Sequence, residues 1–357
     1  MNVQSVNPLI AERPKPTGIQ VLIAAPEDGV LTRMAYRIPF AALSEAELQW
    51  RMVLEGHLQK NDLAGIDCLI LSRCSNSATL PVVRLARRNG IKVLYELDDD
   101  LLQPPQDEEW GRHYSLSCRP RVIKLLLDEA DLVKAGSPEL ARRLQQRGYQ
   151  SIYQPYAIDL PPLQAPQSGP PYRIGYFGTK HHRGDLNRIF PALLEVAETL
   201  GPAVEFQFIG CQPDHWEQLR RVKVRGPIND YHKFLEALTG FAWTLGLAPL
   251  RLTPFNEAKS DSKFRDLSAA GTVGIYAAAA PYRETVRQGV NGWLCAEEPE
   301  AWYRTIMEAL NTPQRRQMVE NARSQLLERN HPTVVAHQWL VIIRQLISSA
   351  ENLKFKF

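Results

Sequence analysis

The chain has 357 residues, of which 44% are hydrophobic and 23% are charged, and its formal net charge at pH 7 is +3. This length predicts about two domains, and the composition is that of a soluble globular protein. A net charge this close to zero argues against nucleic acid as the main partner.

Cysteine spacing and the N-terminal composition indicate the compartment. The five cysteines are scattered and never spaced as CxxC, which favours reduced thiols over disulfides or a zinc site. No apolar run approaches the roughly 20 residues that span a membrane, and residues 1–17 form a polar tail without a signal-peptide stretch. We therefore expect a cytoplasmic protein, and peripheral association with the inner face of the membrane is compatible with that expectation.

The first ordered region alternates strand and helix patterns. Residues 19–25 form a continuous apolar run, as expected for a strand buried on both faces. Similar runs predict further strands at 67–73, 91–97 and 131–136. Helices are expected in the region up to about residue 60 and at 78–90, 121–130 and 137–149, the last with Ser137 as N-cap. This alternation predicts a first α/β domain over residues 18–160, built on a parallel sheet.

A proline-rich stretch then interrupts the pattern. Residues 155–171 contain six prolines, and we take 161–171 as a linker. A second α/β domain is predicted over residues 172–332, with strands at 172–177, 204–210, 243–249, 272–277 and 292–295. Residues 333–357 comprise a final amphipathic helix and a tail. Ligands of such folds bind beyond the carboxyl ends of the strands, so the cleft between the two domains is the expected site.

One candidate phosphate site is the turn after the strand at 172–177. Small residues there, Gly178 and Thr179, let the backbone approach a phosphate at the start of the next helix, which is expected near Asp185. The basic residues that follow strengthen this interpretation; they are Lys180, His181, His182 and Arg183. A tight turn with a solvated basic loop is the alternative.

A second candidate lies in "TPFNEAKSDSKFRDLSAAG", residues 253–271. Ser260 or Asp261 can cap a helix that ends near Ala270, which places Lys259 and Lys263 at its start. Cations at a helix N-terminus oppose the macrodipole by about 0.3–1 kcal/mol each, so their position predicts a bound anion. The alternative is a solvated cluster in which neighbouring aspartates balance the lysines.

Acidic residues follow the strand at 91–97, in "YELDDDLL". Glu96, Asp98, Asp99 and Asp100 lie at the strand end that faces the expected cleft. They either bind a hard cation such as Mg²⁺, or contact sugar hydroxyls and form a cap and turn, which we favour. Near the first strand, Tyr36 and Arg37 are candidate contacts for an anionic or acceptor group, although a helix-surface arginine explains Arg37 equally well.

Together these stretches resemble the GT-B glycosyltransferases, most closely the retaining family 4. The similar segments run in order over most of the chain; they are "AYR" (35–37), "YELDDDLL" (95–102), "ADLVKAGSPELARRL" (130–144), "IGYFGTKHHRGDL" (174–186), "LGLAPLRLTPFNEAKSDSKFRDLSAAG" (245–271) and "PYRETVRQGVNGWLC" (281–295). The resemblance implies α/β architecture with two Rossmann-like domains facing a cleft, and a C-terminal helix that crosses back to the first domain.

The resemblance also implies roles for individual residues. The acceptor would lie on the first domain, near Tyr36 and Arg37, and the sugar nucleotide on the second. The expected donor-binding residues are Gly178, Thr179, Lys180, His182, Arg183, Asn256, Ser260 and Asp266, with Lys259 and Lys263 on the diphosphate. Asp266 stands where the family has a glutamate that bonds the ribose, and Ala258 stands where it has an acid that contacts the donor sugar.

The implied activity is transfer of a sugar from a UDP- or GDP-sugar to a saccharide or glycolipid acceptor, with retention and without a metal or other cofactor. Lys259 and Lys263 would stabilise the leaving diphosphate, while Glu96 and Asp98 would stabilise positive charge on the sugar. Ala258 motivates the alternative of a non-catalytic sugar-nucleotide-binding or scaffold protein on a degenerate GT-B fold. A third hypothesis is that the protein is a sugar-nucleotide epimerase with the GT-B fold.

Overall fold

The computed structural model describes residues 18–163 and 169–348. The predicted tails, residues 1–17 and 349–357, and the linker residues 164–168 lie outside the described residues.

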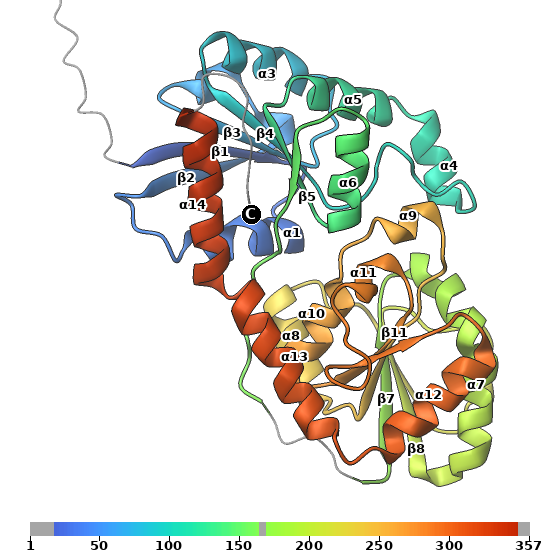
Figure 1. Ribbon diagram of the computed structural model, residues 1–357. Coiled ribbons are helices and arrows are strands. Elements are labelled where there is room, and N and C mark those ends of the chain that lie inside the picture. Colours follow the sequence, from blue (N-terminus) through green and yellow to red (C-terminus); the bar gives the residue numbers. More distant parts are fainter. Residues whose placement is uncertain (1–17, 164–168, 349–357) are drawn as a thin grey trace, which may run out of the picture.

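The first domain is built on a parallel six-stranded sheet in the order β2-β1-β3-β4-β5-β6 (Figure 1). Its strands are β1 (Ile19–Ala25), β2 (Leu48–Leu54), β3 (Cys68–Ser72), β4 (Lys92–Leu97), β5 (Leu132–Ala135) and β6 (Ser151–Tyr153). The central strands β3 and β5 are buried along their whole length, because helices cover both faces of the sheet. On one face lie α3 (Thr79–Arg88), α5 (Arg119–Asp128) and α6 (Pro138–Gln146), and on the other lie the helical stretch Val30–Phe40 and the last helix, α14 (Pro332–Ser348). The short helix α4 (Glu109–Leu116) packs on α5.

The prediction of helix up to residue 60 is wrong beyond residue 40. The chain is continuously helical from Val30 to Phe40, through α1 (Val30–Thr32), a π-helical turn and α2 (Ile38–Phe40), and beyond that it forms only a single 3₁₀ turn at Glu55–His57 before residue 60. β2 then pairs with β1 at the edge of the sheet. Its sequence mixes apolar and charged residues because an edge strand is half exposed, and this pattern hides the strand. The sequence analysis also missed two further edge strands: β9 (Val222–Arg225) is largely exposed, and β6 has only three residues, two of them buried, which is too short for a recognisable pattern.

The second domain repeats the architecture, with a parallel sheet in the order β12-β11-β10-β7-β8-β9. Besides β9, its strands are β7 (Tyr172–Phe177), β8 (Val204–Ile209), β10 (Leu245–Ala248), β11 (Val273–Ala277) and β12 (Trp293–Cys295). The helices are α7 (Arg183–Leu200), α8 (Tyr231–Gly240), α9 (Pro254–Glu257), α10 (Ser262–Ala269), α11 (Ala280–Arg283), α12 (Pro299–Asn311) and α13 (Arg315–Asn330). Strands lie at all five predicted positions.

The last helix, α14 (Pro332–Ser348), returns to the first domain, as predicted (Figure 1). Trp339 is fully buried there: its indole Nε1 donates to the Ala35 carbonyl at 2.8 Å, and its ring lies 5.5 Å from that of Tyr36. The apolar face of this helix therefore completes the core of the first domain.

Candidate active site

The predicted phosphate turn links β7 to α7. Gly178 directly follows Phe177, the last residue of the strand, and a short 3₁₀ turn over Lys180–His182 leads into α7. A Cβ atom on Gly178 would lie 2.5 Å from the Tyr176 hydroxyl, so the close packing of this turn requires glycine. Thr179 and Lys180 are exposed at this point, and Arg183 is half exposed, so the turn presents polar groups to solvent.

Lys263 lies in the first turn of α10 and is only 8% exposed. Its Nζ donates to the Phe177 carbonyl at 2.7 Å and lies 4.7 Å from the ring centroids of Tyr176 and Phe177. Burial lowers the pKa of Lys263 to about 8. A cation held in a desolvated position at the carboxyl end of β7 is poorly compensated by the protein, and an anionic ligand would compensate it.

The predicted N-cap of α10 is correct in position, but the side chain at that position does not cap the helix. Asp261 occupies this position, and its carboxylate instead accepts a bond from Thr285 Oγ1 at 2.9 Å and pairs with Arg329. Ser260 lies partly exposed in the connection between α9 and α10.

His182 joins the two predicted segments. Its Nδ1 lies 2.8 Å from Asp185 Oδ2, and because a carboxylate only accepts, the ring proton resides on Nδ1 and leaves Nε2 to a ligand. Burial lowers the pKa of His182, and the charges of Lys263 and Lys259 lower it further against the opposing effect of Asp185. We call Lys259, Lys263 and the adjacent imidazole of His182 the cation cluster, in which the two lysines carry the positive charge.

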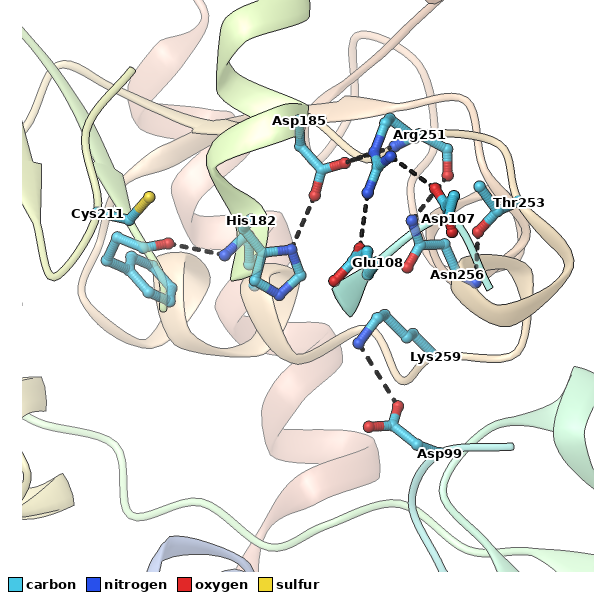
Figure 2. A network of polar contacts seen from close by, with 12 residues as sticks. Asp99, Asp107, Glu108, His182, Asp185, Cys211, Arg251, Thr253, Asn256 and Lys259 are labelled. Atoms are coloured by element: carbon cyan, nitrogen blue, oxygen red, sulfur yellow. Dashed lines mark hydrogen bonds and ion pairs between the residues drawn. The ribbon is translucent and has the colours of Figure 1, made fainter. Parts of the chain in front are cut away.

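The three consecutive aspartates after β4 each have a different cationic partner. Asp98 pairs with Arg73 at 3.1 Å, Asp99 with Lys259 at 3.7 Å, and Asp100 with Arg147 at 2.9 Å. Burial raises the pKa of Asp98 to about 6, against the lowering effect of Arg73. Asp99 thus lies against the cation cluster from the other domain (Figure 2). Within residues 18–163 and 169–348, no group of three or more His, Cys, Asp or Glu side chains is placed to hold a metal ion.

Glu96 and Tyr36 do not face a ligand site, contrary to the predictions. Both side chains are fully buried, and Tyr36 donates to Glu96 at 2.6 Å. Glu96 also accepts from Ser72 at 2.6 Å and from Lys134 at 2.8 Å. Trp339 of α14 covers Tyr36, so neither side chain is available to a sugar or an acceptor. Their burial does not support a catalytic role for Glu96 or an acceptor contact for Tyr36.

Three other predicted residues are already engaged by the protein. Asp266 Oδ1 accepts from the Tyr231 hydroxyl at 2.7 Å and from Arg265 Nε at 3.0 Å, and the residue is only 5% exposed. Asn256 is buried and donates to the Arg251 carbonyl at 3.0 Å. A ribose contact from Asp266 and a direct donor contact from Asn256 are therefore not supported by their positions. Arg37 is exposed and paired with Asp28.

The departure at position 258 has a structural reason. Ala258 is fully buried and belongs to the apolar cluster of the first domain, although its chain segment is in the second. Its carbonyl accepts from Ser137 Oγ at 2.6 Å, and the same hydroxyl caps α6. A glutamate at this position would place a carboxylate in an apolar contact between the domains, which alanine avoids.

A network that the sequence did not reveal joins the domains beside the cation cluster (Figure 2). Arg251, just after β10, contacts Asp107 and Glu108 of the first domain and Asp185 of the second. Trp110 of α4 packs its ring 5.9 Å from His181 and 5.5 Å from Phe255. In the sequence, the acidic residues Asp107 and Glu108 before Trp110 could have indicated a cationic partner. That partner, Arg251, lies 144 residues after Asp107, so the sequence does not identify it.

Two further observations concern regions away from the candidate site. A hollow of about 880 Å³ between α5 and the end of α6 contains none of the predicted site residues. No helix in the described part of the chain is long and apolar enough to cross a bilayer.

The sequence matches no family model, and no curated protein resembles it significantly. Solved structures do match. Sucrose-phosphate synthase from Thermosynechococcus elongatus aligns with a TM-score of 0.66 at 15% identity, over 92% of this chain and 99% of its own. A glycosyltransferase from Rickettsia africae gives 0.65 at 11%, over 93% and 99%. HepE from Anabaena, in complex with UDP and glucose, gives 0.65 at 15%, over 90% and 99%.

These likenesses establish the fold. Two parallel α/β domains with a crossing C-terminal helix, aligned over nearly the whole length of each partner, show that this chain has the GT-B fold. The predicted fold class is confirmed. Membership of family 4 stays a prediction.

Proposed function

We propose that this protein is a retaining glycosyltransferase that moves a hexose from a UDP- or GDP-sugar to a saccharide or glycolipid acceptor without a metal ion. The observation that carries the proposal is the cation cluster: His182, Lys259 and the buried Lys263 converge at the carboxyl end of β7. The proposal is supported by three solved neighbours with the same fold, of which HepE binds UDP and glucose.

The chemistry requires stabilisation of a diphosphate leaving group. As the bond to the anomeric carbon breaks, negative charge grows on the diphosphate, and preorganised cations stabilise it there. Lys259 and Lys263 would neutralise the phosphates, with the backbone of the 178–179 turn as a further donor. In the retaining mechanism implied by the family resemblance, the leaving phosphate accepts the acceptor's proton, so no protein base is needed. Asp98, with a pKa of about 6, is largely ionised at neutral pH and would stabilise positive charge on the sugar.

One observation favours a second function, a sugar-nucleotide-binding protein without catalysis. Ala258 occupies the position of the family acid and is packed against the first domain. Such a protein would bind the nucleotide through the same cation cluster but would not turn over the donor.

A thermal-shift panel with UDP, GDP, dTDP and ADP, each with Mg²⁺ and with EDTA, tests the proposal. We expect UDP or GDP to raise the melting temperature equally under both conditions, because a ligand at 100 times its dissociation constant stabilises by about 2.7 kcal/mol. No response to any nucleotide would contradict nucleotide binding, and a response that needs Mg²⁺ would contradict metal independence. Incubation of the responding sugar nucleotide with saccharide acceptors, followed by NMR of the anomeric proton, then separates transfer with retention from binding alone.

A further inference from the structure

The guanidinium of Arg251 is shared between the two domains. Its Nη1 lies 2.8 Å from Asp107 Oδ2 and its Nη2 lies 2.6 Å from Glu108 Oε1, and both acids belong to the first domain. Its Nε and its backbone nitrogen each lie 3.1 Å from Asp185 Oδ1 in the second domain. All the nitrogens of the side chain are therefore engaged, and the two terminal ones hold the opposite domain.

The exposure of the side chains indicates which of the two ion pairs between the domains is the stronger. The side chains of Arg251 and Glu108 are 22% and 19% exposed, whereas Asp107 is 48% exposed. Exposed pairs contribute little because water and salt screen them, so the bond to Glu108 is the stronger link. Arg251 also keeps three carboxylates from repelling one another, which they would do if the domains met without it.

The second end of the network reaches the cation cluster. Asp185 uses Oδ1 for Arg251 and Oδ2 for the imidazole of His182 (Figure 2). Asn256 fixes the Arg251 carbonyl at 3.0 Å, so the arginine is anchored at its main chain as well. A buried carboxylate held from both sides has one orientation, and the imidazole that donates to it is oriented with it.

We propose that Arg251 is a positioning residue that couples closure of the two domains to the orientation of His182. Asp107 and Glu108 hold the guanidinium only while the domains are together, and Asp185 transmits its position to the imidazole. Domain closure thereby fixes the orientation of the imidazole beside Lys259 and Lys263. The part of this inference that concerns a bound phosphate rests on the proposed function, whereas the closure itself does not.

The test compares Glu108→Gln with Glu129→Gln. Glu129 also accepts from two arginines, Arg84 and Arg87, but all three lie within the first domain, so this control removes a similar carboxylate without touching the interface. Small-angle X-ray scattering of the full chain without nucleotide measures closure. NMR titration of the histidine ring protons, with His182 assigned through His182→Gln, measures the coupling.

We expect Glu108→Gln to increase the radius of gyration and to raise the pKa of His182 towards 6.5, because opening relieves the burial that lowers it. The charges that face the imidazole are Asp185, Lys259 and Lys263, and this substitution changes none of them. Glu129→Gln should leave both measurements at the wild-type values. Unchanged scattering in Glu108→Gln and in the double variant Asp107→Asn/Glu108→Gln would overturn the closure role.

A changed radius of gyration with an unchanged His182 titration would overturn the coupling. Neither measurement uses a nucleotide, so this inference and the proposed function fail separately: a protein that binds UDP but shows no opening contradicts only the role of Arg251.

Discussion

Replacing Lys263 by methionine is expected to weaken nucleotide binding at least tenfold without destabilising the protein at neutral pH. The loss of affinity follows from removal of a charge-assisted contact to phosphate, worth about 1.5–3 kcal/mol. Stability is expected to be maintained or to rise, because methionine fills the buried site without bringing a charge into it. Isothermal titration calorimetry with the nucleotide identified by thermal shift measures the first effect, and chemical denaturation measures the second.

The pH dependence of stability gives a sharper signature of Lys263. Burial lowers its pKa from the ordinary 10.5 to about 8 in the folded protein. Between these values the unfolded chain binds more protons than the folded one, so the free energy of unfolding rises with pH. Below pH 8 both states hold the proton, and the folded state carries a penalty on the order of 3 kcal/mol. The lost bond to the Phe177 carbonyl offsets about 1 kcal/mol of the gain in the methionine variant.

The matched control is Lys233→Met, which removes a charge from an exposed position on α8 of the same domain. This variant should keep both nucleotide affinity and the rise in stability between pH 8 and 10.5. If Lys263→Met binds nucleotide as tightly as the wild type, the cation cluster is not the phosphate site. A stability rise that persists in Lys263→Met would instead show that another group titrates in this range.

The parts of the fold that the sequence predicted are those in which burial alone determines the pattern. β3, β5 and the strands of the second domain's interior are continuous apolar runs because helices cover both of their faces. β2 was not predicted because it is partly exposed to solvent, and its Arg51 pairs with Asp62 on the exposed side. An edge strand is partly exposed to solvent, so its sequence lacks the continuous apolar run that identifies a strand buried on both faces.

Residues of the candidate site could be predicted only where the charges that interact lie within a few residues of one another in the sequence. Two lysines at the start of a helix contradict the macrodipole within a few residues, so Lys263 was recognisable. Glu96 was misread because a strand end looks the same whether its side chains meet solvent or another element. Here the covering groups come from far along the chain, Lys134 from β5 and Trp339 from α14 behind Tyr36. The partners of Arg251 are equally distant in sequence, and nothing in the residues around it specifies them.

Glu96 is therefore expected to contribute to stability. In Glu96→Gln the volume is nearly preserved, but Lys134 remains buried without its counter-ion, which costs about 3–5 kcal/mol. Because stability changes of this size shift the melting temperature by roughly 2–4 °C per kcal/mol in a domain of this length, we expect a loss of roughly 6–20 °C. Differential scanning calorimetry measures it. Ser72→Ala removes one bond to the same carboxylate without removing a charge, and should cost only about 1 kcal/mol.

The pH dependence distinguishes an unpaired lysine from a simple packing defect. The pKa of Glu96 is lowered because Lys134 and its hydrogen bonds outweigh burial, so its contribution is present above the ordinary pKa and is lost as the pH falls. The glutamine variant should lack this loss in acid. At high pH the lone Lys134, whose pKa burial already lowers, gives up its proton while the unfolded chain still holds one. The deficit of Glu96→Gln should therefore narrow towards pH 10, whereas a packing defect would give a constant deficit. The double variant Glu96→Gln/Lys134→Met removes the unpaired charge and keeps an acceptor oxygen for the hydroxyls of Tyr36 and Ser72, so it should recover most of the stability lost in Glu96→Gln.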